Sequence, residues 1–150
     1  MKPLKNLRRH LAHYGLGKTL LFGFRYLQFF YHGRIRCRPT VLRKLPGFSM
    51  ILSTTLRGVS KALYIYGERE LDMQLFLREA LKPGDRTLVV GANIGHNVLT
   101  QATIVGPRGF VFTVEPDPRN LPLLWENIRL NNLESRISVE QCAIGERSGT

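Results

Sequence analysis

The chain has 150 residues, the length of one domain, and an apolar content of 43% that is ordinary for a globular protein. Its two cysteines lie 105 positions apart and match no metal-ligand spacing, so we expect no metal site. The formal net charge of +11 is unevenly distributed along the chain. Residues 1–67 hold 13 Lys and Arg and no Asp or Glu, whereas residues 68–150 hold 9 Lys and Arg and 11 Asp and Glu. The N-terminal part is thus suited to phosphate groups, of either a nucleic acid or an anionic membrane surface.

The first predicted element is an amphipathic helix within residues 14–32, a segment that contains seven of the 14 aromatic residues. Its polar side holds Lys18, Arg25, Gln28 and His32, and its apolar side holds Leu20, Phe24, Leu27, Phe30 and Tyr31. This pattern is typical of a helix that lies in a membrane interface. Packing of the same helix on the rest of the domain is the alternative.

The same segment is too interrupted to span a bilayer, because two charges break fewer than 20 apolar residues. Arg25 also breaks the apolar region that a secretory signal needs, and no small-x-small cleavage site follows it. We therefore expect a cytoplasmic protein with reduced thiols, peripheral at the inner face of the membrane if the helix binds there.

The segment after this helix has weaker signals. Residues 34–45 are rich in Arg and bounded by prolines, and we expect a linker there. Residues 49–55 and 62–66 have β character around a turn at 57–60, which predicts a hairpin.

A helix is predicted over residues 68–81, because apolar side chains recur there at helical spacing, at Leu71, Leu75, Phe76 and Ala80. The expected organisation has three parts: a basic, aromatic-rich segment (1–46), a hairpin with a lead-in helix (47–80) and half of a cofactor-binding domain (81–150).

Strands and helices alternate in the last part. Strands are predicted over residues 86–90, 110–114 and 136–141, and helices over residues 94–105 and 118–131. Such alternation is typical of a parallel α/β sheet with right-handed crossovers, a Rossmann-like fold. The continuous apolar run of the first strand predicts that it is buried on both faces.

A glycine turn follows the first strand, and an acid ends the second. Gly91 allows a sharp turn and leaves room for a ligand against bare main chain, and Gly95 permits a close approach of the next helix to the sheet. Glu115 can accept hydrogen bonds from both hydroxyls of a ribose, while the first amides of the helix face the ligand. The pattern predicts half of a site for a nucleoside-containing cofactor.

Two cofactors suit this half-site, a nicotinamide dinucleotide and S-adenosylmethionine. The dinucleotide fingerprint has a middle glycine that lets the pyrophosphate approach, and the turn GANIG at 91–95 lacks it. With VEPDP at 114–118 and L-x-x-N-x-x-x-N at 124–131, the chain closely resembles the FkbM family of S-adenosylmethionine-dependent methyltransferases. The resemblance covers about residues 64–150 and includes LKPGD at 81–85 and AIGERSG at 143–149.

The resemblance implies a class I methyltransferase fold with a seven-stranded sheet, of which this chain holds the first three strands. We therefore expect a truncated member or a fragment of the family. The resemblance also implies S-adenosylmethionine as the cofactor and a hydroxyl acceptor on a sugar, glycan or small metabolite. It assigns no catalytic base to the residues of this chain.

The cofactor contacts that the resemblance implies come from both loops. Gly91, Asn93 and Gly95 would line the methionine end, Glu115 would hold the ribose, Pro116 and Asp117 would flank the adenine, and Gln141 and Cys142 would lie near its edge. The family usually has an acid two positions before the first glycine, to hold the cofactor's amino group. This chain has Val89 there, which cannot accept a hydrogen bond.

Several residues of these motifs also suit structural roles. Asn93 can cap the helix that follows it. Asn127 and Asn131, four apart on one helical face, are expected to pack or cap rather than catalyse. His96 is expected on the helix surface, and Cys142 is expected as a buried thiol of the core.

Four functions stay open at this point. An active methyltransferase is the first. The others are a non-catalytic remnant whose basic N-terminus binds membranes, an RNA-directed methyltransferase, and a dinucleotide-dependent dehydrogenase. We do not expect nucleic acid as the main partner, and the sequence does not determine the oligomeric state.

Overall fold

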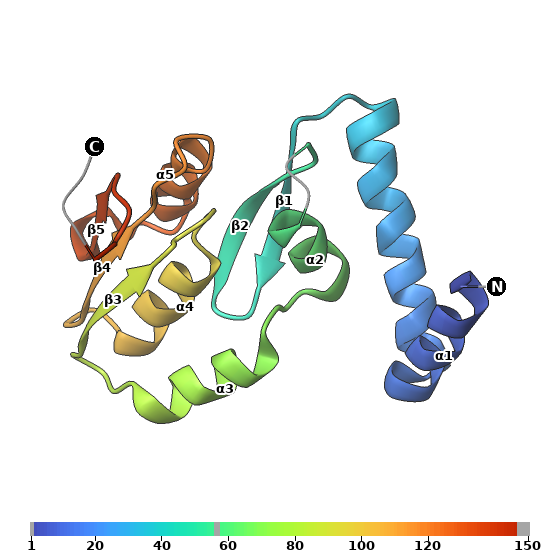
Figure 1. Cartoon of the computed structure of the whole chain (residues 1–150), viewed down its shortest axis with the longest axis horizontal. Coiled ribbons are helices and arrows are strands. Elements are labelled where there is room, and N and C mark those ends of the chain that lie inside the picture. The colour runs from blue at the N-terminus through green and yellow to red at the C-terminus, as the bar shows by residue number, and fades with distance from the viewer. Residues whose placement is uncertain (1, 56–57, 147–150) are drawn as a thin grey trace.

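The computed structural model describes residues 2–55 and 58–146, with side chains from residue 11 onward. Its elements lie in layers (Figure 1): a sheet, two helices on one face of it, a hairpin, and then two further helices. The N-terminal part of the chain lies furthest from the sheet.

Three parallel strands form the sheet, in the order β3 (Arg86–Val90), β4 (Phe110–Val114) and β5 (Ile137–Glu140). The connecting elements are α4 (His96–Val105), α5 (Leu121–Leu130) and the 3-10 turn η2 (Glu134–Arg136). The predicted α/β class is confirmed, and within residues 81–150 the predicted elements differ from the observed ones by at most three residues at their ends.

Within the described residues, only the face that carries α4 and α5 is covered. Val89 and Val111 on that face join the core, in which Val98, Leu99 and Leu124 are fully buried. On the opposite face Leu88 and Val90 are each 60% exposed and Phe112 is 40% exposed. The prediction that the first strand is buried on both faces is therefore wrong for the described chain.

An antiparallel hairpin, β1 (Thr40–Leu45) and β2 (Phe48–Ser53), turns at Pro46 and Gly47. Gly47 has a φ of 91°, which so short a turn requires. The prediction of a linker over residues 34–45 is thus wrong for residues 40–45. The strand was not predicted because it contains two charged residues, Arg43 and Lys44. A strand at the edge of a sheet tolerates charges that a central strand does not.

Residues 62–66 belong to the helix α2 (Val59–Tyr66) and not to a strand, so the predicted hairpin partner is wrong. Aromatic residues gave this segment its β character. The helix buries Leu63, Tyr64 and Ile65, and it ends at Gly67 with a left-handed φ of 77°. Packing against β2 on one side and the N-terminal helix on the other stabilises it. The predicted turn at 57–60 includes residue 57, which lies outside the described residues.

Two asparagines, one within α5 and one at its C-terminal cap, bind the hairpin. The carboxamide of Asn127 accepts the N–H of Ile51 at 2.6 Å and donates to the carbonyl of Ile51 at 3.1 Å. Asn131 makes the same pair of bonds to Ser49, at 2.9 and 2.8 Å. The prediction that these two residues are structural is confirmed.

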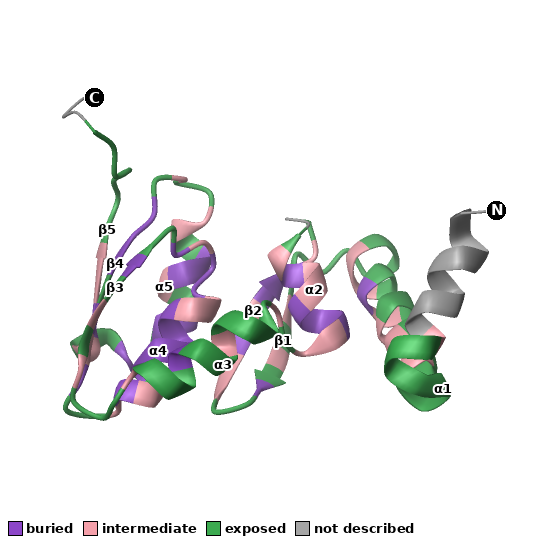
Figure 2. Cartoon of the chain, turned by 60° about the horizontal axis from the view of Figure 1, so that its bottom comes forward, coloured by how far each residue is buried: buried purple, intermediate pink, exposed green. Residues whose placement is uncertain are grey.

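The helix α3 (Leu71–Ala80) forms as predicted, but its apolar face is not covered. Leu77 is buried, whereas Leu71, Leu75 and Phe76 are 51%, 52% and 62% exposed. Figure 2 shows this exposure along most of α3.

The first helix, α1 (Lys2–Phe30), has a kink at Gly15, where φ is 74°, and it continues into the π-turn η1 (Tyr31–Ile35). It packs on α2 through Phe22, whose ring lies 4.9 Å from that of Tyr66, and through Phe29, 5.3 Å from Tyr64. None of the described helices combines the length and the apolar character that a membrane span requires.

Candidate cofactor site

The turn after β3 is fastened to the tip of β4. Gly91 and Ala92 both donate their main-chain N–H to the carbonyl of Val114, at 2.9 and 3.0 Å. The φ angles of Gly91, Asn93 and Gly95 are positive, at 79°, 50° and 100°. Asparagine adopts this conformation more readily than other side chains, and Asn93 Oδ1 also accepts the N–H of Ile94 at 2.9 Å. The turn therefore holds a tightly curved main chain at the carboxyl end of the sheet.

The two glycines of the turn have different surroundings. A Cβ on Gly95 would lie 2.9 Å from Cδ1 of Leu124, so the missing side chain lets α5 pack closely against the turn. A Cβ on Gly91 would meet nothing within 4 Å, and Gly91 itself is exposed. The main chain at Gly91 is thus open to a ligand, whereas Gly95 serves packing.

Glu115, immediately after β4, directs its carboxylate at the glycine turn and is only 4% exposed. Its Oε2 accepts the N–H of Asn93 at 2.6 Å. Its Oε1 accepts the N–H of Asp117 at 2.9 Å and Nδ2 of Asn120 at 3.1 Å. These three donors compensate the burial of the charge and tie the loops after β3 and β4 together. A carboxylate has about four acceptor positions, so the three donors among the described residues leave one position for a further donor.

A cavity of about 360 Å³ lies against these two loops. Its wall is formed by the sheet loops and by the start of α2: Asn93, Ile94, Asp117, Arg119, Asn120, Thr55, Val59 and Ser60. All three residues that donate to Glu115 are in this wall, so the carboxylate lies directly behind it. The volume is within the range of small-molecule sites.

An ion pair lies on the wall of this cavity. Arg119 Nη2 contacts Asp117 Oδ2 at 2.6 Å, and the main-chain N–H of Arg119 donates to Asp117 Oδ1 at 2.9 Å. The hydrogen bonds from Arg119 lower the pKa of Asp117 from 3.8 to about 2. The carboxylate is therefore ionised at neutral pH, and its charge is balanced by the guanidinium beside it.

His96, the first residue of α4, packs against the hairpin. Its ring centroid is 6.1 Å from that of Phe48, in an edge-on arrangement. Burial lowers the pKa of His96 below its usual value, so the imidazole is neutral at pH 7. The imidazole is half-buried, so the prediction of a histidine on the helix surface holds only in part, because Phe48 of the hairpin lies against it. His96 is not among the residues that line the 360 Å³ cavity.

The structure places Asn93 and Asp117 in the cavity wall with Glu115 bonded behind them, and Gly91 and Gly95 on the adjoining turn. Pro116 is exposed between Glu115 and Asp117. Gln141 is also exposed, as the first residue beyond β5.

Two further residues that the resemblance singled out lie away from the cavity wall. Cys142 is exposed beyond the end of β5, so the prediction of a buried thiol is wrong: the strand ends at Glu140 and the chain leaves the sheet before the cysteine. Val89 is 7% exposed in the core, and its carbonyl accepts the hydroxyl of Thr113 at 3.0 Å.

The sequence analysis missed the contribution of the N-terminal part to this site. Thr55, Val59 and Ser60 line the cavity, although they lie more than thirty residues before Asn93 in the chain. No sequence signal places them there, since the docking of the hairpin and α2 decides it. Asn120 was also missed, because the predicted helix over residues 118–131 included it, whereas α5 begins one residue after it, at Leu121.

The parallel sheet, the glycine turn and the acid at the tip of β4 define a Rossmann-like fold of the methyltransferase type. No family model and no curated protein matches the chain. Solved structures do match. P. horikoshii TYW2 in complex with MeSAdo has a TM-score of 0.55 and 25% identity, over 70% of this chain and 36% of that chain.

Two other matches have the same fold at lower identity. The M. jannaschii tRNA m1G37 methyltransferase has a TM-score of 0.52 and 17% identity, over 69% of this chain and 31% of that chain. An SAM-dependent methyltransferase from Agrobacterium tumefaciens has a TM-score of 0.52 and 16% identity, over 69% of this chain and 32% of that chain. The chain thus has the fold of S-adenosylmethionine-dependent methyltransferases and spans about a third of the length of these structures.

Proposed function

We propose that this chain binds S-adenosylmethionine and supplies the cofactor half of a methyltransferase of the FkbM type. The single observation that carries the proposal is the carboxylate of Glu115, which is buried behind the cavity wall and is held there by three donors of the wall residues. A buried acid with a spare lone pair at the tip of a parallel strand suits a ribose hydroxyl. The similarity to methyltransferase structures supports the same assignment.

The hydrogen bonds of Glu115 suggest how a ribose would be accepted. One hydroxyl can use the free acceptor position without displacing a donor. A second hydroxyl would replace the bond from Asn120, which is the longest of the three at 3.1 Å. The main-chain amides of Asn93 and Asp117 would keep the carboxylate in place during this exchange.

The methionine end of the cofactor would lie along the bare main chain at Gly91, where nothing lies within 4 Å of the position that a Cβ would take. Val89 offers no charge to the cofactor's amino group, because it is an apolar residue of the core. Main-chain carbonyls of the turn are the remaining acceptors for that group. We therefore expect cofactor binding that relies on the ribose contact at Glu115.

When bound, S-adenosylmethionine supplies an electrophilic methyl group on a positive sulfur. The acceptor that we propose is a hydroxyl of a sugar, glycan or small metabolite, as the FkbM resemblance implies. The contribution of this chain would be alignment and exclusion of water, through the curved turn and the wall formed by Thr55 and α2. His96 has no part in this proposal, because it packs under the hairpin.

Isothermal titration of the chain with S-adenosylmethionine tests the proposal, with nicotinamide dinucleotide as the comparison. We expect heat of binding and a thermal shift with S-adenosylmethionine and none with the dinucleotide. Absence of both signals at millimolar cofactor would contradict the proposal. Binding of the dinucleotide alone would instead support a dehydrogenase.

An RNA acceptor is a second candidate. Solved structures of the same fold include a tRNA methyltransferase, and residues 1–67 hold 13 basic and no acidic residues. Filter binding of tRNA over a range of salt concentrations tests it. Phosphate contacts weaken as salt rises, so a steep loss of affinity with salt would support an RNA acceptor. Retention that does not change with salt would contradict it.

A further inference from the structure

The outer face of α1 carries an exposed apolar stripe. Its residues follow helical spacing and face away from α2: Leu16, Leu20, Phe24, Leu27 and Phe30, which are 66%, 65%, 59%, 65% and 52% exposed. Figure 2 shows α1 at the edge of the molecule, with exposed residues along this helix. Five large apolar side chains on one helical face form a patch of the kind that marks an interaction surface.

The stripe is not the face that packs within the chain. Phe22 and Phe29, on the opposite side of the helix, contact the aromatic rings of α2. Arg25 also lies on that side, and its Nη1 donates to the carbonyl of Ile65 at 3.1 Å. One side of α1 therefore serves the fold, and the apolar stripe remains available.

Basic residues surround the stripe. Arg34, Arg36 and Arg38 follow it directly and are all exposed. The segment before it contains four further Lys and Arg, and no acid occurs before residue 68. A patch that is apolar along its length and is followed by three exposed arginines suits a surface with acyl chains below anionic headgroups.

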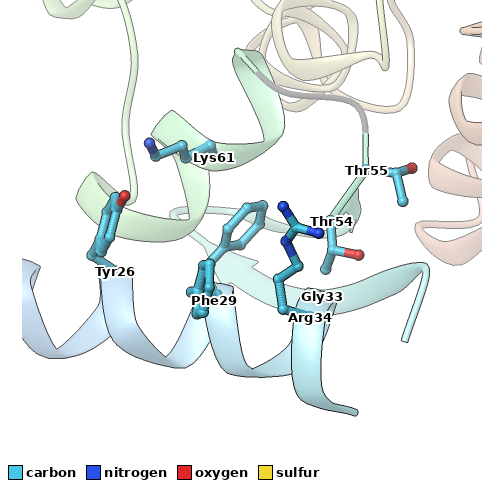
Figure 3. A pocket seen from close by; sticks show the side chains of 8 residues that line it. Tyr26, Phe29, Gly33, Arg34, Thr54, Thr55 and Lys61 are labelled. Atoms are coloured by element: carbon cyan, nitrogen blue, oxygen red, sulfur yellow. The ribbon is translucent and has the colours of Figure 1, made fainter. Parts of the chain in front are cut away.

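A pocket of about 520 Å³ lies at the C-terminal end of the stripe, between α1 with η1, the residues that follow β2, and α2. Figure 3 shows Arg34 and Lys61 on different sides of this pocket, Arg34 near Thr54 and Lys61 near Tyr26. Lys61 Nζ lies 4.6 Å from the ring centroid of Tyr26. Neither Arg34 nor Lys61 forms an ion pair with an acid of the described chain. Phe30 lines the pocket and also belongs to the stripe, so the two features are continuous.

We propose that the outer face of α1 binds an anionic lipid surface, with the phosphate of one headgroup in the pocket between Arg34 and Lys61. The stripe would lie among the first methylenes of the acyl chains. The two cations would contact the phosphate oxygens from different sides of the pocket. This site is separate from the cofactor cavity, except that Thr55 lines both.

A lipid surface explains the stripe better than a nucleic acid does. Phosphate contacts alone need basic side chains and do not need exposed leucines. Aromatic rings can stack on unpaired bases, but of the five stripe residues three are leucines, which cannot. The combination of leucines, aromatic rings and flanking arginines is therefore assigned to a membrane interface.

Co-sedimentation of the full chain with two kinds of vesicle tests the proposal. One kind is phosphatidylcholine alone, and the other is phosphatidylcholine mixed with phosphatidylglycerol. We expect pelleting with the anionic vesicles and little with the neutral ones, with a loss of binding at high salt. Failure to pellet with the anionic vesicles, or equal pelleting with both kinds, would overturn the proposal.

Two pairs of variants locate the binding surface. Leu20→Glu with Phe24→Glu should lower binding to anionic vesicles by about tenfold or more, because both residues would have to enter the interface. The matched control, Leu71→Glu with Leu75→Glu, makes the same charge change on the exposed face of α3 and should bind nearly as wild type. A larger loss in the control than in the α1 variant would contradict the assignment.

The pocket is tested in the same assay. Arg34→Gln with Lys61→Gln should lower binding to anionic vesicles by about tenfold. The control Arg129→Gln with Arg108→Gln removes two exposed cations from the cofactor half and should lower it less. Circular dichroism of each variant verifies that the chain is folded, so a loss of binding reports on the surface.

Two soluble ligands distinguish other sources of the same phosphate chemistry. The chain is titrated with inorganic phosphate, and its binding of tRNA is measured on filters. If either ligand binds in a way that depends on Arg34 and Lys61, and vesicles do not bind, the membrane assignment is overturned. Titration of the α1 variants with S-adenosylmethionine should give the affinity of the wild type. Failure of vesicle binding therefore leaves the proposed cofactor site standing, and the reverse also holds.

Discussion

Asn127 of α5 and Asn131, which caps the C-terminus of that helix, bond both the N–H and the carbonyl of Ile51 and Ser49, which are two residues apart on β2. Four helical residues rise about 6.0 Å and two strand residues about 6.6 Å, so the two spacings nearly match. The carboxamides therefore take the place that a neighbouring strand would have at the edge of β2. Asn127 Nδ2 also donates to the carbonyl of Ile94 at 2.9 Å, which links the hairpin to the glycine turn.

Replacement of Asn127 by leucine should destabilise the fold. The side chain is fully buried, and the leucine would leave the main-chain groups of Ile51 and Ile94 without partners. We expect a loss of about 3 kcal/mol in the free energy of unfolding, measured by urea denaturation. The exposed neighbour Arg129→Ala should change it by less than about 0.5 kcal/mol. An unchanged midpoint for the Asn127 variant would contradict this role.

The two glycines of the turn should respond differently to alanine. Gly95→Ala adds backbone strain and an overlap with Leu124, so we expect a loss of about 3 kcal/mol in stability. Gly91→Ala adds strain only, at about 1–2 kcal/mol, because nothing lies within 4 Å of the new Cβ. If the main chain at Gly91 faces the cofactor, the Gly91 variant should nevertheless lose S-adenosylmethionine affinity. Thermal denaturation and calorimetry on the same samples separate the two effects.

Glu115→Gln tests the ribose contact. A glutamine has a similar shape but no charge. Its Nε2 is a hydrogen-bond donor, and it would face N–H groups that donate to a carboxylate oxygen in the wild type. We expect S-adenosylmethionine affinity to fall by roughly tenfold to a hundredfold in calorimetry. Glu126→Gln, an exposed change on α5, is the control and should bind as wild type. Equal affinities for the two variants would refute the role of Glu115.

His96 should make stability dependent on pH. Burial lowers its pKa in the folded state below 6.5, so the unfolded chain binds the proton more readily. Stability is then complete above pH 6.5 and falls as the pH is lowered toward the pKa of the folded state. We expect His96→Gln to flatten this slope in urea titrations between about pH 5 and 8, whereas His13→Gln, an exposed change on α1, should not. Asp117 does not contribute in this range, because its pKa is about 2.

The elements of the cofactor half were predictable because their signals are local. The apolar runs of β3 and β4, the glycines between β3 and α4, and Pro118 before α5 each restrict the main chain directly. The hairpin was misplaced for the opposite reason. Thr40–Leu45 contains two cations and adjoins Pro39 and Pro46, and it is a strand because it pairs with Phe48–Ser53. Val59–Tyr66 is a helix because it packs between β2 and α1.

By itself, the sequence determined the α/β alternation, the glycine turn after the first strand and the acid at the tip of the second strand. These features depend on a few neighbouring residues, each of which limits its own main chain. Only the tertiary structure decided that three residues, Asn93, Asp117 and Asn120, donate to the carboxylate of Glu115. It also decided that Thr55 and Ser60 line the cavity. The outward orientation of the apolar stripe of α1 is a third feature of this kind. Such contacts join residues that are distant in the chain. They are fixed by which surfaces pack together, and no local pattern carries that information.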